Sequence, residues 1–457
     1  MQVTKTTYLK LISLVQLENW SSYALLGKNL IYTQKYPFVK IGYFLKRNKI
    51  QVSIQNGILY KRATIKINGN GITLRNNIEI DGKDIGTKNQ FLIKEGQFLL
   101  SKIDARNGAF GVVPKELDNG VITGNFWTFD VDYSQINPHY LTLLTGTKKF
   151  QELSQTASVG TTNRNYLQEK SFLNFEIPLP SLLEQERILN AYNEKIKQAK
   201  ILELMSNYQN DEIDNYLFEK LGISKQISVE KSSKLSHISL SELSVWGADR
   251  LLRGGNKSIL YSSKYPNQKL GNVVYVNPRT DLSKIKDTDS MSFIPMECVS
   301  DEYGEIKELR EGQKSRTTGY TKFQEGDLIW ARITPCMQNG KSTIVRGLNN
   351  GLGYGSTEFH VLRKKDVNFS LEFAYHILRT KAILQDAVNH FTGSAGQQRV
   401  PKEYLENLLI PVPPISIQNE ISEYIFKSKA EIKEKKMLAE RKRMEAKHEF
   451  EHEIFGK

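Results

Sequence analysis

The sequence predicts an α+β fold in which two pseudo-twofold-related globular domains are separated by two long antiparallel helices that form a coiled-coil-like spacer. Three observations support this prediction. The 457-residue chain repeats itself at long range, each copy begins with short β-rich runs, and each copy ends in a segment with helical periodicity. The repeat is far longer than the roughly 20–50-residue period of a solenoid protein, so the chain is expected to hold two domains of similar plan.

The repeat is clearest in two Ile-Pro phrases. Residues 177–188 read IPLPSLLEQERI and residues 410–421 read IPVPPISIQNEI, an offset of 410 − 177 = 233 residues. Other segments pair in the same order: LISLVQLENW (11–20) with HISLSELSVW (237–246), and KEGQFLLSKIDARNG (94–108) with QEGDLIWARITPCMQNG (324–340). The offset is 226 at Trp20 and Trp246 and 233 at the Ile-Pro phrases, so few insertions separate the copies.

The first part of each copy has the composition of β-strands. Runs of β-branched and aromatic residues alternate with Gly, Asn and Asp, at 57–67, 89–103 and 124–132 in the first copy and at 320–333 and 356–364 in the second. Such runs are typical of strands bounded by turns. Short helical segments follow at 137–155 and 367–391. Each copy is therefore expected to form a mixed α and β domain.

The segment after each Ile-Pro phrase changes to helical periodicity. Apolar residues recur every three or four positions among Glu, Lys and Gln, at Ile188, Tyr192, Ile196, Ala199 and Leu202, and at Ile417, Ile421, Ile425, Ile432 and Ala439. Prolines prevent an earlier helix start and are tolerated in a first turn. We expect two helices of about 35–40 residues, roughly 55–60 Å each at about 1.5 Å per residue.

A narrow apolar stripe on a long charged helix is suited to a helix partner. The two long helices are therefore expected to bury their stripes against each other in antiparallel orientation, with one domain at each end. The alternative is that each helix folds back onto its own domain.

Charge and cysteine content narrow the functional classes. With 63 Lys and Arg against 50 Asp and Glu, the net charge is +13 and the pI about 9.3, which favours a polyanionic partner such as DNA or RNA. A basic protein without such a partner is the alternative. Two separate cysteines, Cys298 and Cys336, indicate a reducing cytoplasm rather than a disulfide framework or a cysteine-type zinc site. No apolar run is long enough to predict a transmembrane helix.

Two strings resemble catalytic motifs. His448-Glu449-Phe450-Glu451-His452 matches HExxH but lies in the charged end of the last helix, so we expect a solvated helical face and no metal site. Asn137-Pro138-His139-Tyr140 resembles the Asn-Pro-Pro-Tyr/Phe loop of amino-methyltransferases. It lacks the preceding glycine-rich cofactor turn, and Asn followed by Pro predicts a helix start. The second copy, with Asn368-Phe369-Ser370, keeps a capping residue there.

Two pairs of loops could contact DNA. One pair is 102–108 with 332–341, and the other is 160–165 with 393–399. Small residues let a backbone approach phosphate, Arg and Lys suit guanine edges, and Asn and Gln suit adenine edges. The alternative is that these are polar surface turns. The candidate DNA-binding residues are Lys102, Arg106, Asn107, Gly160, Thr161, Thr162, Asn163, Arg164, Arg332, Thr334, Gln338, Lys341, Gln397, Gln398 and Arg399.

The whole pattern resembles the specificity subunit of type I restriction–modification systems. The resemblance depends on the loop, the Ile-Pro phrase and the helix starting Gln185-Glu186-Arg187-Ile188 or Gln418-Asn419-Glu420-Ile421, each present twice. It covers nearly the whole chain. The first copy departs from the pattern in its loop, GTTNRN at 160–165, which lacks the glutamine found in the second copy.

The resemblance implies a division of labour within the chain. Residues 1–180 and 226–413 would be target recognition domains, each reading one half of a split site in double-stranded DNA, and residues 181–225 and 414–457 would be conserved spacer helices. The helices would dock two methyltransferase subunits that bind S-adenosylmethionine and methylate adenine. Motor-nuclease subunits using ATP and magnesium would add cleavage. This chain would hold no cofactor and no catalytic residue. It would act in the cytoplasm and would not associate with a membrane.

Three alternatives remain open at this point. The chain could serve a type IIB-like or other defence-associated methyltransferase without the type I motor. It could be an adenine methyltransferase in its own right through Asn137-Pro138-His139-Tyr140. It could also be a scaffold that joins two proteins, in which case its binding would be insensitive to salt, unlike DNA binding.

Overall fold

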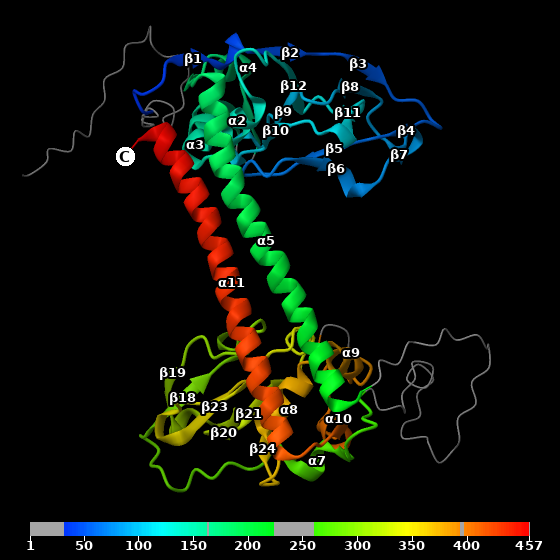
Figure 1. Ribbon diagram of the computed structural model, residues 1–457, viewed down its shortest axis with the longest axis vertical. Helices are drawn as coiled ribbons and strands as arrows, with labels where there is room; N and C mark the ends of the chain where they lie inside the picture. The colour runs from blue at the N-terminus through cyan, green and yellow to red at the C-terminus, as the bar shows by residue number, and fades with distance from the viewer. Residues whose placement is uncertain (1–31, 162–163, 224–259, 394–396, 457) are drawn as a thin grey trace, which may run out of the picture. The chain divides into compact units, whose positions relative to one another are not determined.

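The computed structural model describes residues 32–161, 164–223, 260–393 and 397–456 (Figure 1). The chain divides into two compact units. Unit 1 comprises residues 1–201 and 438–457, and unit 2 comprises residues 202–437. The division therefore falls inside both long helices, and each unit contains a β-rich head and one half of each helix. The paired segments LISLVQLENW and HISLSELSVW, with Trp20 and Trp246, lie outside the described residues.

The head of unit 1 is made of short strands and short helices, as the sequence predicts. Its strands are β1 (Phe38–Lys40), β2 (Leu45–Asn48), β3 (Gln51–Ser53), β4 (Leu59–Tyr60), β5 (Ala63–Ile65), β6 (Ile72–Leu74), β7 (Ile80–Asp81), β8 (Asn89–Ile93), β9 (Phe98–Ser101), β10 (Phe110–Val112), β11 (Gly120–Ile122), β12 (Phe126–Val131), β13 (Ser158–Thr161), β14 (Arg164–Leu167) and β15 (Glu176–Pro178). Its helices are α2 (Pro138–Thr145), α3 (Lys148–Thr156) and α4 (Glu169–Leu173), and α5 (Leu182–Leu221) follows.

The head of unit 2 has the same kinds of element. Its strands are β16 (Asn267–Lys269), β17 (Val274–Val276), β18 (Ser290–Ile294), β19 (Arg310–Gln313), β20 (Thr321–Gln324), β21 (Leu328–Ala331), β22 (Ser342–Ile344), β23 (Leu352–Gly355), β24 (Phe359–Lys364) and β25 (Leu409–Pro411). Its helices are α7 (Leu270–Val273), α8 (Leu371–Leu378), α9 (Lys381–Val388) and α10 (Lys402–Asn407), and α11 (Ile415–Phe455) follows.

Each head contains a four-stranded sheet with the same arrangement of strands. Its order is β2-β12-β9-β10 in unit 1 and β17-β24-β21-β22 in unit 2, so equivalent strands occupy equivalent places. The turn that precedes β9 in unit 1 and β21 in unit 2 also repeats. Gly96 and Gly326 lie in these turns, and both have a φ of 82°, a conformation that glycine adopts at little cost. The repeat seen in the sequence is therefore a repeat of backbone structure.

The second sheet differs between the heads. In unit 1 it is β11-β8-β3, entirely antiparallel, whereas in unit 2 it is β19-β18-β23-β20 and contains a parallel pair, β18 with β23. Unit 1 also carries two small two-stranded sheets, β4-β7 and β5-β6. The common sheet is thus the fixed part of each head, and the second sheet is the part in which the two copies diverge.

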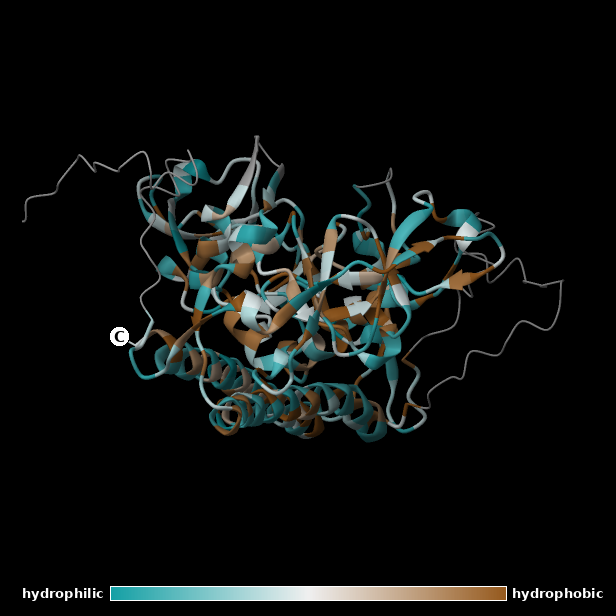
Figure 2. Ribbon diagram, turned by 90° about the horizontal axis from the view of Figure 1, so that it is seen from above, coloured by the Kyte–Doolittle hydropathy of each residue, from teal (hydrophilic) through white to brown (hydrophobic). Residues whose placement is uncertain are grey.

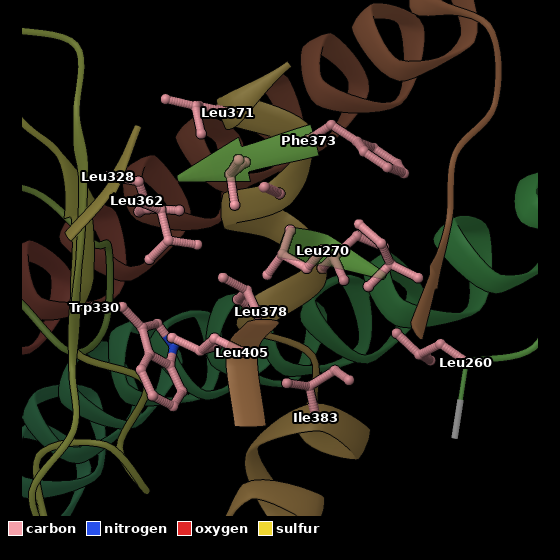
Figure 3. Close-up of a cluster of buried hydrophobic side chains, with 14 of the residues drawn as sticks. Leu260, Leu270, Leu328, Trp330, Leu362, Leu371, Phe373, Leu378, Ile383 and Leu405 are labelled. Atoms are coloured by element: carbon pink, nitrogen blue, oxygen red, sulfur yellow. The ribbon is translucent and has the colours of Figure 1, made fainter. Parts of the chain in front are cut away.

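Each head has its own apolar core. In unit 2, Trp330 from β21 packs with side chains from short helices, including Leu378 of α8 and Ile383 of α9, and all three are fully or almost fully buried (Figure 3). In unit 1, the ring centroid of Phe110 lies 5.8 Å from that of Phe150 and 6.0 Å from that of Phe172. Figure 2 shows apolar residues gathered within the heads, whereas the long helices are largely hydrophilic.

The predicted pairing of the long helices is confirmed within each unit. In unit 1, Lys195 pairs with Glu449 at 2.9 Å, and Phe450 and Ile454 of α11 are buried in the core of the head. In unit 2, Lys220 pairs with Glu420 at 2.6 Å, and the rings of Tyr216 and Tyr424 stack with centroids 3.7 Å apart. Residue numbers rise along α5 as they fall along α11, so the helices are antiparallel. Their lengths, 40 and 41 residues, match the prediction.

A buried glutamine fixes the start of each long helix to its head. Gln185 accepts a hydrogen bond from the Asn137 amide at 2.8 Å and donates to the carbonyls of Gln135 and Pro180 at 3.2 and 2.8 Å. Gln418 makes the same three bonds, with Ser370, Asn368 and Pro413, at 2.8, 3.1 and 2.8 Å. Both glutamines are 0% exposed, so these bonds form without competition from water.

The Ile-Pro phrases form the strands that hold this junction. β15 pairs with β1, with Ile177 opposite Val39, and β25 pairs with β16, with Ile410 opposite Gln268. The chain therefore repeats the phrase because each copy uses it in the same way. The phrase supplies a strand that pairs with the head, prolines that end the strand, and a glutamine that bonds the start of the long helix to the head.

Helix α2 begins as predicted, with Asn137 capping it through the His139 amide and Pro138 at the first turn. In the second copy the capping residue is Ser370, which accepts from the Phe373 amide. Asn368 instead supplies a carbonyl to Gln418. Ser370 therefore corresponds to Asn137, because both precede the first helical residue and both offer their amide to the glutamine.

We predict that Gln418→Ala destabilises the junction of α11 with its head. The variant would leave the Ser370 amide and the Asn368 and Pro413 carbonyls without their partner, at a cost of about 2–4 kcal/mol. Hydrogen exchange measured by mass spectrometry should show faster exchange in peptides covering residues 368–378. Asn419→Ala, at the exposed neighbouring position, is the control, and equal protection in the two variants would contradict the anchor role.

Candidate nucleic-acid interface

The structure brings together the two candidate loops of unit 2. The segment 332–341 follows β21, and Thr392 and Arg399 of the other loop pair with each other in an antiparallel bridge. The Val400 amide donates to the Arg332 carbonyl at 2.8 Å, and the Thr334 amide donates to the Gln398 carbonyl at 3.1 Å. Loops that are about 60 residues apart in the sequence therefore form one surface.

The same contact joins the candidate loops of unit 1. The Leu167 amide donates to the Lys102 carbonyl at 2.9 Å, which corresponds to the bond between Val400 and Arg332. The hairpin is formed by β13 and β14, with Gly160 opposite Asn165 and Thr161 opposite Arg164. Its register matches that of unit 2, since Val159 is opposite Tyr166 as Thr392 is opposite Arg399.

Carboxylate and arginine groups meet at the unit 2 surface. Arg399 donates to Glu358 through Nε at 2.9 Å and Nη2 at 2.8 Å, and Arg332 Nε lies 3.5 Å from the same carboxylate. The hydrogen bonds from Arg399, followed by the charge of Arg332, hold the pKa of Glu358 below its usual range. The cluster carries a net positive charge and is about one-third exposed at Arg332.

An open groove of about 990 Å³ lies beside this cluster in unit 2. Four basic residues line it, against the single acidic residue Asp281; they are Arg279, Lys314, Lys322 and Arg332. Thr280, Ser283 and Tyr320 add hydroxyl groups to its walls. A groove with this balance of charge is suited to a phosphodiester backbone, because phosphate contacts come mainly from Lys, Arg and hydroxyl side chains.

The other predicted residues take varied positions. Lys102 lies with its Nζ 5.8 Å from the ring centroid of Tyr166. Asn107 is exposed and bonds to Asp104, and Arg106 is half-buried in the same short turn. Lys341 donates to the Met296 carbonyl at 3.3 Å, whereas Gln338 and Gln397 are exposed. Thr162 and Asn163 lie outside the described residues, as do the side chains of Thr161 and Arg164, and Gly160 is described only by its backbone pairing.

Sequence reasoning missed several residues of this surface. Glu358 and its counterpart Asn125 each precede a buried strand, and their carbonyls accept from the Arg332 and Lys102 amides at 2.9 and 3.0 Å. Arg279 and Lys322 lie on separate segments that only the fold joins. A polar residue directly before an apolar strand was the available signal for the first two.

The residues of the amino-methyltransferase-like string Asn137-Pro138-His139-Tyr140 have structural roles in the head of unit 1. Asn137 caps α2, and the Tyr140 hydroxyl donates to the Pro178 carbonyl at 2.9 Å. The Tyr140 side chain is 0% exposed and so is closed to a base stacking on it. The interpretation of this string as a helix start is confirmed.

The HExxH string lies on α11 in unit 1, where His448 and His452 are exposed as expected of a solvated helical face. Within the described ranges, no cluster of three or more His, Cys, Asp or Glu side chains could hold a metal ion. Over those same ranges, no helix is both long and apolar enough to cross a bilayer.

The buried histidine His360 contacts the backbone just after the bridge between Thr392 and Arg399. His360 Nε2 lies 2.8 Å from the Val400 carbonyl and Nδ1 lies 3.0 Å from Asn277 Nδ2, so the neutral ring donates to the carbonyl and accepts from the amide. Burial lowers the pKa of His360 to about 4. The ring therefore stays neutral in the folded protein at neutral pH.

The chain belongs to the family of type I restriction modification DNA specificity domains. The family model matches residues 23–228 and 262–440, which is one match for each copy of the repeat. Both candidate interfaces lie within the matched regions.

Individual relatives agree with this assignment. The chain is 37% identical over 157 residues to the type I restriction enzyme EcoEI specificity subunit and 38% identical over 157 residues to the EcoAI specificity subunit, both of Escherichia coli. These matches cover 33% of this chain and 25% and 26% of the relatives, so the chain matches about a quarter of their length.

The fold is also that of a solved protein. A chain from a structure of the type I R-M system, described for its complex assembly and conformational transition, aligns with a TM-score of 0.55 over 93% of this chain and 97% of its own length. At 15% identity this likeness shows the fold alone. The predicted α+β class with long paired helices is confirmed.

We predict that the protein loses stability as the pH falls from about 6.5 to 4. The unfolded imidazole of His360 takes up a proton near its ordinary pKa of 6.5, whereas the folded ring does so only near 4. The unfolded state then binds more protons, which costs the folded state up to about 3 kcal/mol over this range. Chemical denaturation at a series of pH values measures the loss.

His360→Gln is the matching variant, because the amide can still donate to the Val400 carbonyl but does not titrate. We expect a shallower loss of stability with acid in this variant than in the unaltered protein. His376, whose pKa burial lowers to about 3, remains in both proteins. Identical pH dependence in the two proteins would contradict the role of His360.

Proposed function

We propose that this chain is the DNA-recognition subunit of a type I restriction–modification complex. In this proposal each head reads one half of a split site in double-stranded DNA. The observation that carries it is the pair of matching surfaces in which a loop after a buried strand meets an antiparallel pair of segments, at Lys102 and Leu167 in unit 1 and at Arg332 and Val400 in unit 2. Family membership supports the same role.

The charge of the surface supports DNA as the ligand. The unit 2 groove presents four basic side chains, and the chain carries a net charge of +13. Basic residues along a groove release counterions from the DNA backbone, which supplies affinity without sequence selection. Selection then comes from side chains that reach base edges.

The division into parts is proposed as the sequence suggested it. Residues 1–180 and 226–413 are the recognition domains, and residues 181–225 and 414–457 are the spacer helices. The helices leave several large apolar side chains exposed, including Leu183, Tyr208, Phe426 and Met444, which supports the docking of two methyltransferase subunits along them. Restriction subunits with a motor and nuclease join where the system has them.

Catalysis is assigned to the partners in this proposal. S-adenosylmethionine would be bound by the methyltransferase subunits, and ATP and magnesium by the restriction subunits. The chain itself would be non-catalytic and would act in the cytoplasm, where its DNA target is accessible.

We predict that mapping methylated adenines in cells will reveal a split sequence that depends on this chain. The motif should be present when the chain is expressed with its methyltransferase subunits and absent when the chain is deleted. Restoring the chain on a plasmid is the control. Unchanged methylation after deletion, or a motif with a single continuous word, would contradict a bipartite reader.

A further inference from the structure

The two units carry different side chains at three equivalent backbone positions, which we call the frame positions. In unit 2 these positions hold Arg332, Glu358 and Arg399, and in unit 1 they hold Lys102, Asn125 and Tyr166. The equivalence rests on hydrogen bonds. The Lys102 and Arg332 amides donate to the carbonyls of Asn125 and Glu358 at 3.0 and 2.9 Å, and their carbonyls accept from the residues that follow Tyr166 and Arg399.

The side chains of unit 2 form an ordered set. Arg399 grips Glu358 with two donors, Nε at 2.9 Å and Nη2 at 2.8 Å, and turns a third, Nη1, to the Gln397 carbonyl at 2.9 Å. Arg399 is therefore committed to holding the carboxylate. Glu358 in turn stands 3.5 Å from Arg332 Nε.

Arg332 is placed differently from Arg399. It lines the open groove, it is 34% exposed, and its Nε is buried without a hydrogen bond. The Glu358 carboxylate attracts this guanidinium on its Nε side. A guanidinium that is held by a carboxylate at Nε and lines a groove is suited to a bidentate contact with the O6 and N7 acceptors of guanine.

Unit 1 has no such arrangement at the same positions. Lys102 offers a single ammonium group, which lies against the ring of Tyr166, and Asn125 is neutral and exposed. A lysine acts as a point charge rather than a planar fork, and an asparagine offers both a donor and an acceptor. The same backbone thus presents a different pattern of donors and acceptors.

We propose that these three frame positions determine which base each unit selects, with Arg332 reading a guanine in the unit 2 half-site and Glu358 acting as the positioning residue behind it. This inference rests on the proposed function, since it requires that unit 2 contacts DNA through its groove. Arg399 orients Glu358 and does not itself touch the base.

The test uses the full chain assembled with its methyltransferase subunits and a library of duplexes randomised across the recognised site. Arg332→Lys keeps the charge and removes the fork, and Glu358→Gln keeps the shape and removes the charge. Both should lower the preference for guanine at one position of one half-site by about 10- to 100-fold. The other half-site should be selected unchanged.

The matched controls are Arg346→Lys and Glu372→Gln. These residues form an exposed pair in unit 2 at 2.6 Å, and neither lines the groove. The selected sequence should stay as it is in both control variants. Unfolding midpoints measured for all four variants show whether each one folds, and Arg332→Lys keeps the test informative if Glu358→Gln does not.

The outcomes separate the inference from the proposed function. If the unaltered complex selects no split sequence, the proposed function itself fails. If it selects one and both variants select the same sequence, the inference is wrong. If the variants weaken binding to all sequences equally and reduce its salt dependence, Arg332 contacts a phosphate and the base-reading role is overturned.

Discussion

The fold depends on one interaction made twice, the buried glutamine at the start of each long helix. Gln185 and Gln418 each tie the first turn of a helix to the backbone before α2 or α8 and to the proline that ends the Ile-Pro phrase. Each carboxamide uses its oxygen and its nitrogen, so the side chain can be satisfied only when the head and the helix are in place together. A charged or apolar residue could not meet the three partners.

This anchor explains how a duplicated chain can diverge in one part and stay fixed in another. The shared sheet, the Ile-Pro strand and the glutamine set the exit of the helix from each head. The second sheet and the loops at the candidate interface do not contribute to that exit. Side chains there, such as Glu358 or Asn125, make none of the glutamine contacts, so they can differ between the copies while the anchor stays the same. The proposed reading of two half-sites requires such freedom.

Much of the architecture was readable from the sequence because it is periodic. The strands at 89–103 and 320–333, the short helices and both long helices lie where β-branched runs and three-to-four spacing predict them. The cap of α8 was less visible, since Ser370 rather than Asn368 takes the role. The candidate loops were visible because each occurs in both copies, whereas their contact within each copy is a result of the fold.

The side-chain network at the interface was not readable. Glu358 contacts both Arg332 and Arg399, which lie on two other segments of the chain. The spacing of these three residues in the sequence does not predict that they meet. The same is true of Arg279 and Lys322, which line one groove from different segments. A repeat reveals equivalent backbone positions, whereas contacts between non-local side chains depend on tertiary packing.

Photocrosslinking from residues 165 and 398 to a duplex bearing the recognised site tests most directly whether each head reads its own half-site. A photoreactive residue would replace Asn165 in unit 1 or Gln398 in unit 2, in the complex with methyltransferase subunits. If each head reads its own half-site, crosslinks form to one half-site from position 165 and to the other from position 398, at equivalent places within each. Crosslinks from both positions to the same half-site, or to neither, would contradict it.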